Sequence, residues 1–267
     1  MHVRESVQSW RDKNPDYVHL LWDDADMNEM VKTLYPSWWT YWKAMPVNVN
    51  RADVFRYLVL DSFGGVYTDA DTQCLRPVDT WIDDEDLAEW KYKSKEVERT
   101  HKGGDSDTVA FIGGVETDVP KNRTDWHIYY HAPMQICQWT MASAPYHPIP
   151  ARAAGNVFHR IAKVMRAKGK WDESYLPSVD APKLTGPAPW TDAVYSFWRE
   201  QGINPEAMRE FGDRGKVTSD VLILPITAFS PGLMQVLTTV FGDMGSKRIE
   251  DPAARVRHMW KGTWRPT

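Results

Sequence analysis

The chain has 267 residues and a mass of 30.8 kDa, which suits a single α/β domain with a sizeable core. Its 32 basic and 36 acidic side chains leave a net charge of −4 without any long basic run, which argues against nucleic acid as a partner. Two cysteines, Cys74 and Cys137, are too few for a disulfide framework or a cysteine-rich zinc cluster. No apolar run approaches the roughly 18 residues of a membrane-spanning helix. We therefore expect one globular, soluble domain over residues 1–267.

The N-terminal part predicts a helix, a strand and two further helices. Residues 2–12 place apolar side chains at helical spacing, and the run Tyr17–Trp22 has the composition of a buried strand. Helices are expected over Met27–Leu34 and Ser37–Met45, because Pro36 interrupts the helical pattern between them.

A first D-x-D pattern lies between these segments, at Asp24 and Asp26. It is one candidate for a metal site. The alternative is helix capping, because acidic side chains near a helix N-terminus stabilise it by roughly 0.3–1 kcal/mol. We favour capping for this pair.

The most informative stretch follows, over residues 49–79. Asn50 is a candidate N-cap with Asp53 at the acidic third position, so a helix is expected from about Arg51 to Phe63. Gly64 and Gly65 then supply the left-handed stop that ends a helix. A short strand at residues 66–68 is predicted to follow.

This strand leads directly into Asp69 and Asp71. Two carboxylates at this spacing, just past a strand, can bind one hard divalent cation and leave positions open for phosphate oxygens. The chemistry indicated is metal-assisted departure of a diphosphate. A D-x-D pattern alone is weak evidence, since acidic pairs after strands are usually solvated loop residues.

The middle of the chain predicts a charged insertion followed by a strand. Residues 83–107 are rich in charge and are expected to form a solvated surface loop, with acceptor recognition as the alternative. Residues 108–112 predict a strand. Glu116 and Asp118 come after its glycines, where they either sit in a turn or contribute to the site.

The C-terminal half predicts helices over residues 135–144, 147–168 and 193–201, and a last strand over residues 221–226. Thr191 or Asp192 is the expected cap of the third helix, and both could instead face a sugar.

Near the C-terminus, His258 lies beside Arg255 and Arg257. Imidazole is a good ligand for a divalent ion, and arginine binds phosphate through paired N–H groups. A single histidine in this position is more often structural.

Seven ordered segments, from about Pro15 to Trp264, resemble fungal glycosyltransferase family 32 enzymes of the initiation-specific α-1,6-mannosyltransferase type. The central block resembles the sugar-binding region with a DXD motif. The segments are LWDDAD, NRADVFRYLVLDSFGGVYTDADTQCLRP, GGVETD, QICQWTMASAPYHP, TGPAPWTDAV, VLILPITAFSPG and HMWKGTW.

The resemblance implies a GT-A fold, in which helices flank a mixed central sheet. It also implies Mn²⁺ or another divalent cation as cofactor and GDP-mannose as donor. Mannose would be transferred with retention to an oligosaccharide or glycoprotein acceptor, in an α-1,6 linkage that initiates the outer chain of N-glycans. Family members are type II membrane proteins of the Golgi lumen, through an anchor that is absent from this sequence.

The resemblance also implies roles for particular residues. Asp69 and Asp71 would bind the metal with His258 as third ligand, and the two aspartates would be the catalytic residues. The expected donor-binding residues are Asp53, Arg56, Tyr67 and Asp69. Candidate sugar or acceptor contacts are Glu116, Asp118, Thr191, Asp192 and Trp264.

Two departures keep other interpretations open. The family's first strand, of the type K-I-x-Q-x-W, has no counterpart here, so we expect an exposed sheet edge. The alternatives are a transferase of another nucleotide sugar and a non-catalytic glycan-binding relative without a donor site. A phosphohydrolase of the D-x-D-x-T type fits less well, because Thr72 comes one place too early.

Overall fold

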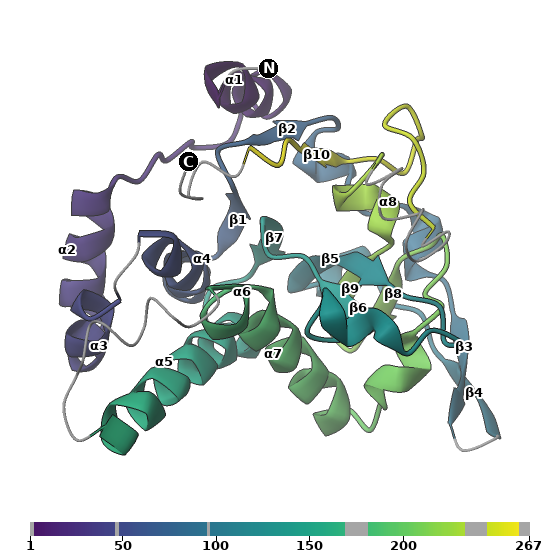
Figure 1. Cartoon of the computed structure of the whole chain (residues 1–267). Helices are drawn as coiled ribbons and strands as arrows, with labels where there is room; N and C mark the ends of the chain where they lie inside the picture. Colours follow the sequence, from purple (N-terminus) through teal and green to yellow (C-terminus); the bar gives the residue numbers. More distant parts are fainter. Residues whose placement is uncertain (1–2, 46–47, 95–96, 169–180, 233–244, 262–267) are drawn as a thin grey trace.

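A mixed six-stranded sheet forms the centre of the protein, with strand order β1-β7-β5-β9-β8 and β6 paired to β5 (Figure 1). The computed structural model describes residues 3–45, 48–94, 97–168, 181–232 and 245–261. The α/β class predicted from the sequence, with a mixed sheet flanked by helices, is confirmed.

The helices of the described part are α1 (Val3–Lys13), α2 (Asp24–Leu34), α3 (Trp39–Lys43), α4 (Asn48–Phe63), α5 (Pro148–Lys168), α6 (Ala181–Leu184), α7 (Pro187–Glu200) and α8 (Ile226–Phe229). Its strands are β1 (Gly65–Thr68), β2 (Thr72–Cys74), β3 (Trp90–Ser94), β4 (Val97–His101), β5 (Phe111–Asp118), β6 (Met134–Ile136), β7 (Thr140–Ser143), β8 (Lys216–Thr218), β9 (Val221–Leu224) and β10 (Val256–His258).

The sheet separates two apolar cores, as the alternation of side chains along β9 shows. Val221 and Ile223 pack into the larger core, which also includes side chains of α4, α5 and α7. Leu222 and Leu224 point the other way, into a second core with residues of α8 and β10. Because successive side chains of a strand point to opposite faces, this fully apolar strand is buried on both sides.

The predicted strand at Tyr17–Trp22 is wrong, since this segment has no regular structure. Val18 and Leu20 are 87% and 67% exposed. A segment forms a strand only when it is hydrogen-bonded to a neighbouring strand. In the described part β1 pairs only with β7, so residues 17–22 are not paired with the other edge of β1. A cavity of about 440 Å³ lies between this segment and β1. The expected exposed sheet edge is therefore found at β1.

The predicted helix at residues 135–144 is also wrong. This stretch forms β6 and β7, and both strands pair antiparallel with β5. Ile136, Trp139 and Thr140 are β-branched or aromatic residues, which favour strands, and all three are buried. Tertiary pairing outweighs the helical spacing of the apolar side chains.

The charged region 83–107 is not a structureless loop. It contains a 3₁₀ turn, Asp84–Leu87, and the hairpin formed by β3 and β4. Asp86 is buried, and its carboxylate accepts a hydrogen bond from Arg255 at 2.6 Å and from the backbone N–H of Gly215 at 2.6 Å. Part of the charge predicted to be solvated therefore forms an internal ion pair that anchors the chain just before β10.

The two glycines that follow α4, Gly64 and Gly65, differ in what surrounds them, which allows a matched test. Both have positive φ, but a Cβ on Gly64 would lie 2.6 Å from Pro145 N, whereas a Cβ on Gly65 would meet nothing within 4 Å. Gly65→Ala should cost about 1–2 kcal/mol of unfolding free energy, the cost of a left-handed L-residue. Gly64→Ala should cost clearly more in urea denaturation. Equal losses would show that the contact with Pro145 is unimportant.

Candidate metal and donor site

The turn between β1 and β2 holds Asp69 and Asp71. Its backbone is fixed from two directions: Thr72 N donates to Asp69 O at 3.1 Å, and Asp69 N donates to Trp139 O at 2.9 Å. The Thr72 hydroxyl also donates to Asp69 O at 2.7 Å. This turn places the two carboxylates at one edge of the sheet, as the sequence predicts.

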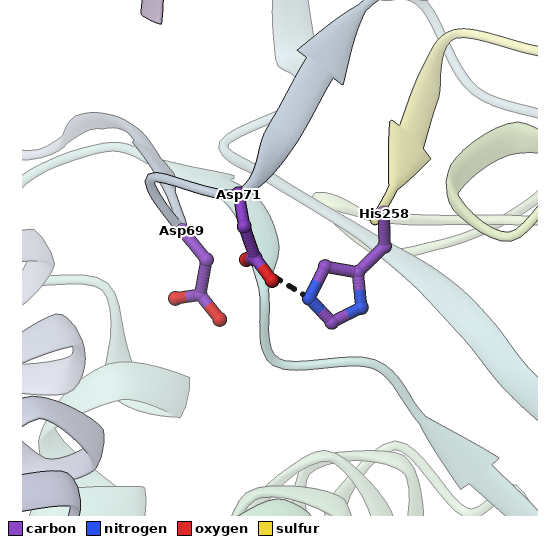
Figure 2. Close-up of side chains that lie close together, drawn as sticks. All are labelled: Asp69, Asp71 and His258. Carbon is purple, nitrogen blue, oxygen red and sulfur yellow. Dashed lines mark hydrogen bonds and ion pairs between the residues drawn. The ribbon is translucent and has the colours of Figure 1, made fainter. Parts of the chain in front are cut away.

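His258 reaches the same turn from the other end of the chain. β10 pairs antiparallel with β2, with His258 opposite Thr72. Its Nε2 lies 3.1 Å from Asp71 Oδ1, as Figure 2 shows. Two backbone N–H groups also hold Asp71. Met259 N donates to the backbone carbonyl of Asp71, and Lys261 N donates to its carboxylate oxygen Oδ2.

These three side chains fit a divalent ion. One ligand atom from each of Asp69, Asp71 and His258 can be chosen so that all lie within 4.8 Å of one another. Neighbouring ligands of an octahedral ion, each about 2.1 Å from it, are about 3 Å apart, close to the separation of Asp71 and His258. Two carboxylates and an imidazole suit Mn²⁺ or Mg²⁺.

The charge state of Asp71 also suits a cation. Burial raises the pKa of this carboxyl, but the His258 hydrogen bond and charge and the Lys261 N–H outweigh burial, so the pKa is lowered overall. Asp71 is therefore ionised and available as a ligand at neutral pH.

The guanidinium of Arg56 holds the Asp69 side chain in place. The guanidinium lies 2.8 Å from Asp53 Oδ1 and 3.5 Å from Asp69 Oδ1, and it donates to Gln138 O at 3.0 Å. The Tyr67 hydroxyl donates to the same Asp69 oxygen at 2.8 Å. Burial lowers the pKa of Arg56, but Asp69, Tyr67 and Asp53 outweigh it and raise the pKa, so the cation is retained.

The side chains of Asp53 and Arg56 are almost fully buried. They are 3% and 5% exposed. Asp53 accepts hydrogen bonds from the Thr185 hydroxyl at 2.8 Å and from Gln138 Nε2 at 3.3 Å. Burial raises the pKa of Asp53 to about 6, against the opposing effects of Arg56, Thr185 and Gln138. The pair positions Asp69, and its direct contact with a donor stays a prediction.

Asn50 is not the N-cap of α4, which begins two residues earlier. Its side chain is buried and donates to the Thr185 hydroxyl at 2.8 Å. The capping box predicted for Asn50 and Asp53 is therefore wrong, because both side chains face inward to Thr185.

Sequence reasoning missed Gln138, Trp139 and Thr185. Trp139 stacks on His258, with ring centroids 4.9 Å apart and planes 13° apart. Both Gln138 and Trp139 lie in the segment predicted as a helix, which concealed their role in linking β6 and β7 to the site. A strand prediction for residues 134–143 would have placed them at the sheet edge.

The remaining candidate contacts have different surroundings. Thr191 is fully buried and accepts from Ile136 N at 3.1 Å, so it offers no surface to a sugar. Asp192 is paired with Arg160 at 2.6 Å and His131 at 3.0 Å. Neither caps a helix, because α7 begins at Pro187 with Gly186 as N-cap. Trp264 lies outside the described residues.

Glu116 and Asp118 lie on β5, and each has a specific hydrogen-bond partner. Gln135 Nε2 donates to Glu116 Oε2 at 2.8 Å, and Phe211 N donates to Asp118 Oδ2 at 2.7 Å. A sugar contact for either side chain stays a prediction.

The rival pair at Asp24 and Asp26 belongs to a helix cap. Asp23 accepts from the N–H groups of Ala25 and Asp26, and the Asp26 side chain accepts from Asp23 N, which completes a capping box for α2. The capping interpretation is confirmed.

Asp71→Asn tests the metal site, with Asp24→Asn as control. The asparagine keeps an oxygen for the Lys261 N–H but loses the charge, so we expect Mn²⁺ affinity to fall about tenfold or more with little change in unfolding. The exposed Asp24 belongs to the other D-x-D, and its variant should bind Mn²⁺ like the wild type. Isothermal titration calorimetry measures both affinities. Equal losses in the two variants would contradict the assignment.

Arg56→Ala tests the buried ion pair. The substitution leaves Asp53 buried without its cation, so we expect a loss of about 3–5 kcal/mol at pH 7 by urea denaturation. Without Arg56 the folded-state pKa of Asp53 rises further above its unfolded value. The folded state then binds the extra proton, and the loss should be smaller at pH 4. A loss independent of pH would indicate a packing effect alone.

Comparisons with known proteins show which proteins share this geometry's sequence features. Residues 1–88 match the family model described as "Glycosyltransferase sugar-binding region containing DXD motif", which includes Asp53, Arg56, Asp69 and Asp71. The D-x-D turn between β1 and β2 therefore lies inside the segment that this family model matches.

Curated relatives extend the similarity over most of the chain. The "Initiation-specific alpha-1,6-mannosyltransferase" of Candida albicans is 31% identical, over 97% of this chain and 66% of the relative. The enzyme of the same name from Schizosaccharomyces pombe is 33% identical, over 98% of this chain and 60% of the relative. The chain is thus similar to these two enzymes over nearly its whole length, and residues 1–88 carry the match to the DXD sugar-binding region. The chain spans 66% and 60% of the lengths of these two relatives.

A shorter match reaches a transferase whose name gives a different acceptor. "Inositol phosphoceramide mannosyltransferase 3" of Schizosaccharomyces pombe is 33% identical over 45% of this chain and 33% of the relative.

Among solved structures, the "PaToxG Glycosyltransferase" is similar with a TM-score of 0.37 and 16% identity, covering 74% of this chain and 64% of that one. In the described ranges, no helix combines the length and apolar character needed to cross a membrane.

Proposed function

We propose that the protein is a metal-dependent mannosyltransferase that uses GDP-mannose and acts on a mannose-containing glycan. The observation that carries this proposal is the convergence of Asp69, Asp71 and His258 from two distant parts of the chain. The names of the relatives over nearly the whole chain support mannose as the transferred sugar.

The residues of the site have separate tasks. Asp69, Asp71 and His258 would hold the divalent ion, which we propose to be Mn²⁺. A bound ion of this kind offsets the charge that develops on the departing diphosphate. Arg56 and Tyr67 keep Asp69 in place, because their donors converge on one of its oxygens. Such preorganisation leaves little reorganisation for the reaction itself.

The finer features of the proposal come from the similarity to the α-1,6-mannosyltransferases. We propose transfer with retention of the α configuration, an α-1,6 linkage that initiates N-glycan outer chains, and a type II membrane form in the Golgi lumen. The three candidate metal ligands support a donor with a diphosphate group, because the ion that they would hold binds phosphate oxygens.

A nucleotide panel tests the donor class. GDP, UDP and ADP are each added with Mn²⁺ or with a chelator, and the melting temperature is measured. A ligand at 100 times its Kd adds about 2.7 kcal/mol of stability, enough to shift the melting temperature by several degrees. We expect stabilisation by GDP only when Mn²⁺ is present, and none in Asp71→Asn.

The other outcomes separate the competing functions. Selective stabilisation by UDP would identify a different sugar nucleotide. Stabilisation by none of the three would favour a non-catalytic relative. Release of phosphate from a simple phosphate ester, without a nucleotide sugar, would favour the phosphohydrolase. Transfer from GDP-mannose to methyl α-D-mannopyranoside, followed by linkage analysis, tests the reaction directly.

A further inference from the structure

Glu116 occupies an irregular position in the sheet. β5 and β6 pair Val115 with Ile136 and Thr117 with Gln135, so Glu116 is an extra residue in a β-bulge. Bulges redirect a side chain out of the regular ladder and are over-represented next to active sites.

The carboxylate of Glu116 is held on one side only. Gln135 Nε2 donates to Oε2 at 2.8 Å, while Gln135 is 3% exposed and its own oxygen accepts from His131 N at 3.1 Å. The amide is thereby fixed with its N–H toward the carboxylate. Oε1 of Glu116 has no partner in the described part and is not among the enclosed side-chain atoms. One oxygen is therefore anchored, and the other is open to a ligand.

The surroundings of Glu116 favour an uncharged hydrogen-bond donor as its ligand. Burial raises the pKa of this carboxyl to about 7 despite the Gln135 hydrogen bond, and no Lys or Arg contributes to the shift. Because Oε1 has no hydrogen-bond partner in the described part, a ligand that donates to it adds an interaction, and bonds to a charged acceptor are the stronger ones. A sugar hydroxyl is such a donor.

The segment 135–139 connects Glu116 to the metal and donor site. Gln135 contacts Glu116, Gln138 contacts Asp53, and Trp139 both accepts from Asp69 N and stacks on His258. Four residue steps of extended chain span at most about 14 Å. Glu116 is therefore within reach of a short oligosaccharide whose end lies at the D-x-D turn.

We propose that Glu116, oriented by Gln135, binds a hydroxyl of the acceptor glycan and sets acceptor specificity. This inference rests on the proposed mannosyl transfer but concerns a different substrate and different residues from the metal cluster. A site built to hydrogen-bond a hydroxyl rejects analogues that lack it, because its buried groups then stay unpaired. Glu116 is thus a binding residue for the acceptor, and Gln135 is a positioning residue.

Glu116→Gln tests this role, with Glu210→Gln as matched control. Glu210 is an exposed carboxylate paired with Lys121 at 3.1 Å. With GDP-mannose and a short manno-oligosaccharide as acceptor, Glu116→Gln should raise the acceptor KM about tenfold or more, the scale of one lost charge-assisted hydrogen bond. The Kd for GDP with Mn²⁺ and the slow hydrolysis of GDP-mannose should stay at wild-type values. Gln135→Met should also raise the acceptor KM. Glu210→Gln should leave the acceptor KM, the Kd for GDP and the hydrolysis rate unchanged.

Two results would overturn the inference. One is an unchanged acceptor KM in Glu116→Gln, and the other is an equal loss of GDP affinity, which would show a general disturbance of the site. The substitution should not unfold the protein. Because the folded-state pKa of about 7 exceeds the ordinary pKa of 4.5, the carboxylate destabilises the fold increasingly as pH rises from 4.5 to 7, and Glu116→Gln should melt at least as high as wild type at pH 8.

A direct binding measurement separates this inference from the proposed function. If the wild type transfers no mannose, saturation-transfer NMR of the same manno-oligosaccharide still reports sugar binding. A signal in the wild type that is lost in Glu116→Gln supports the inference even though the proposed reaction has failed. Equal signals in both proteins, or no signal in the wild type, would overturn it.

Discussion

The structure of the site depends on one buried cation. Arg56 contacts the carboxylates of Asp53 and Asp69 and the carbonyl of Gln138, and so joins α4, the D-x-D turn and the connection between β6 and β7. Burying a guanidinium is unfavourable unless it is paired and hydrogen-bonded. Because these partners come from three parts of the chain, the ion pair forms only when all three are assembled, and it favours one arrangement of the site.

The second support of the site comes from the C-terminal end of the described chain. β10 delivers His258 to Asp71, and Arg255 anchors the chain just before this strand through Asp83 and Asp86. The region 83–107 therefore contributes to the site indirectly, through a buried ion pair. Through these contacts the candidate metal site combines residues that are far apart in the sequence.

Short motifs were predictable from the sequence, whereas the pairing of distant segments was not. The D-x-D turn, the helix α4 and the capping role of Asp23–Asp26 follow from local patterns that the structure retains. Residues 135–144 were predicted as a helix because their apolar spacing fits one, and it is pairing with β5 and β1 that makes β6 and β7 strands. Tyr17–Trp22 shows the converse, since a strand-like composition forms no strand without a partner. The burial of Asp53 and Arg56 was equally invisible, because it depends on Thr185 and Gln138.

The outer edge of β1 affects how the protein behaves in solution. Its backbone N–H and C=O groups have no strand beside them in the described part, and the exposed side chains of Val18, Leu20, Leu21 and Phe63 lie around the same cavity. Unprotected edges of this kind pair readily with strands of other molecules. Edge-to-edge association at β1 would depend on protein concentration and not on how the site folds.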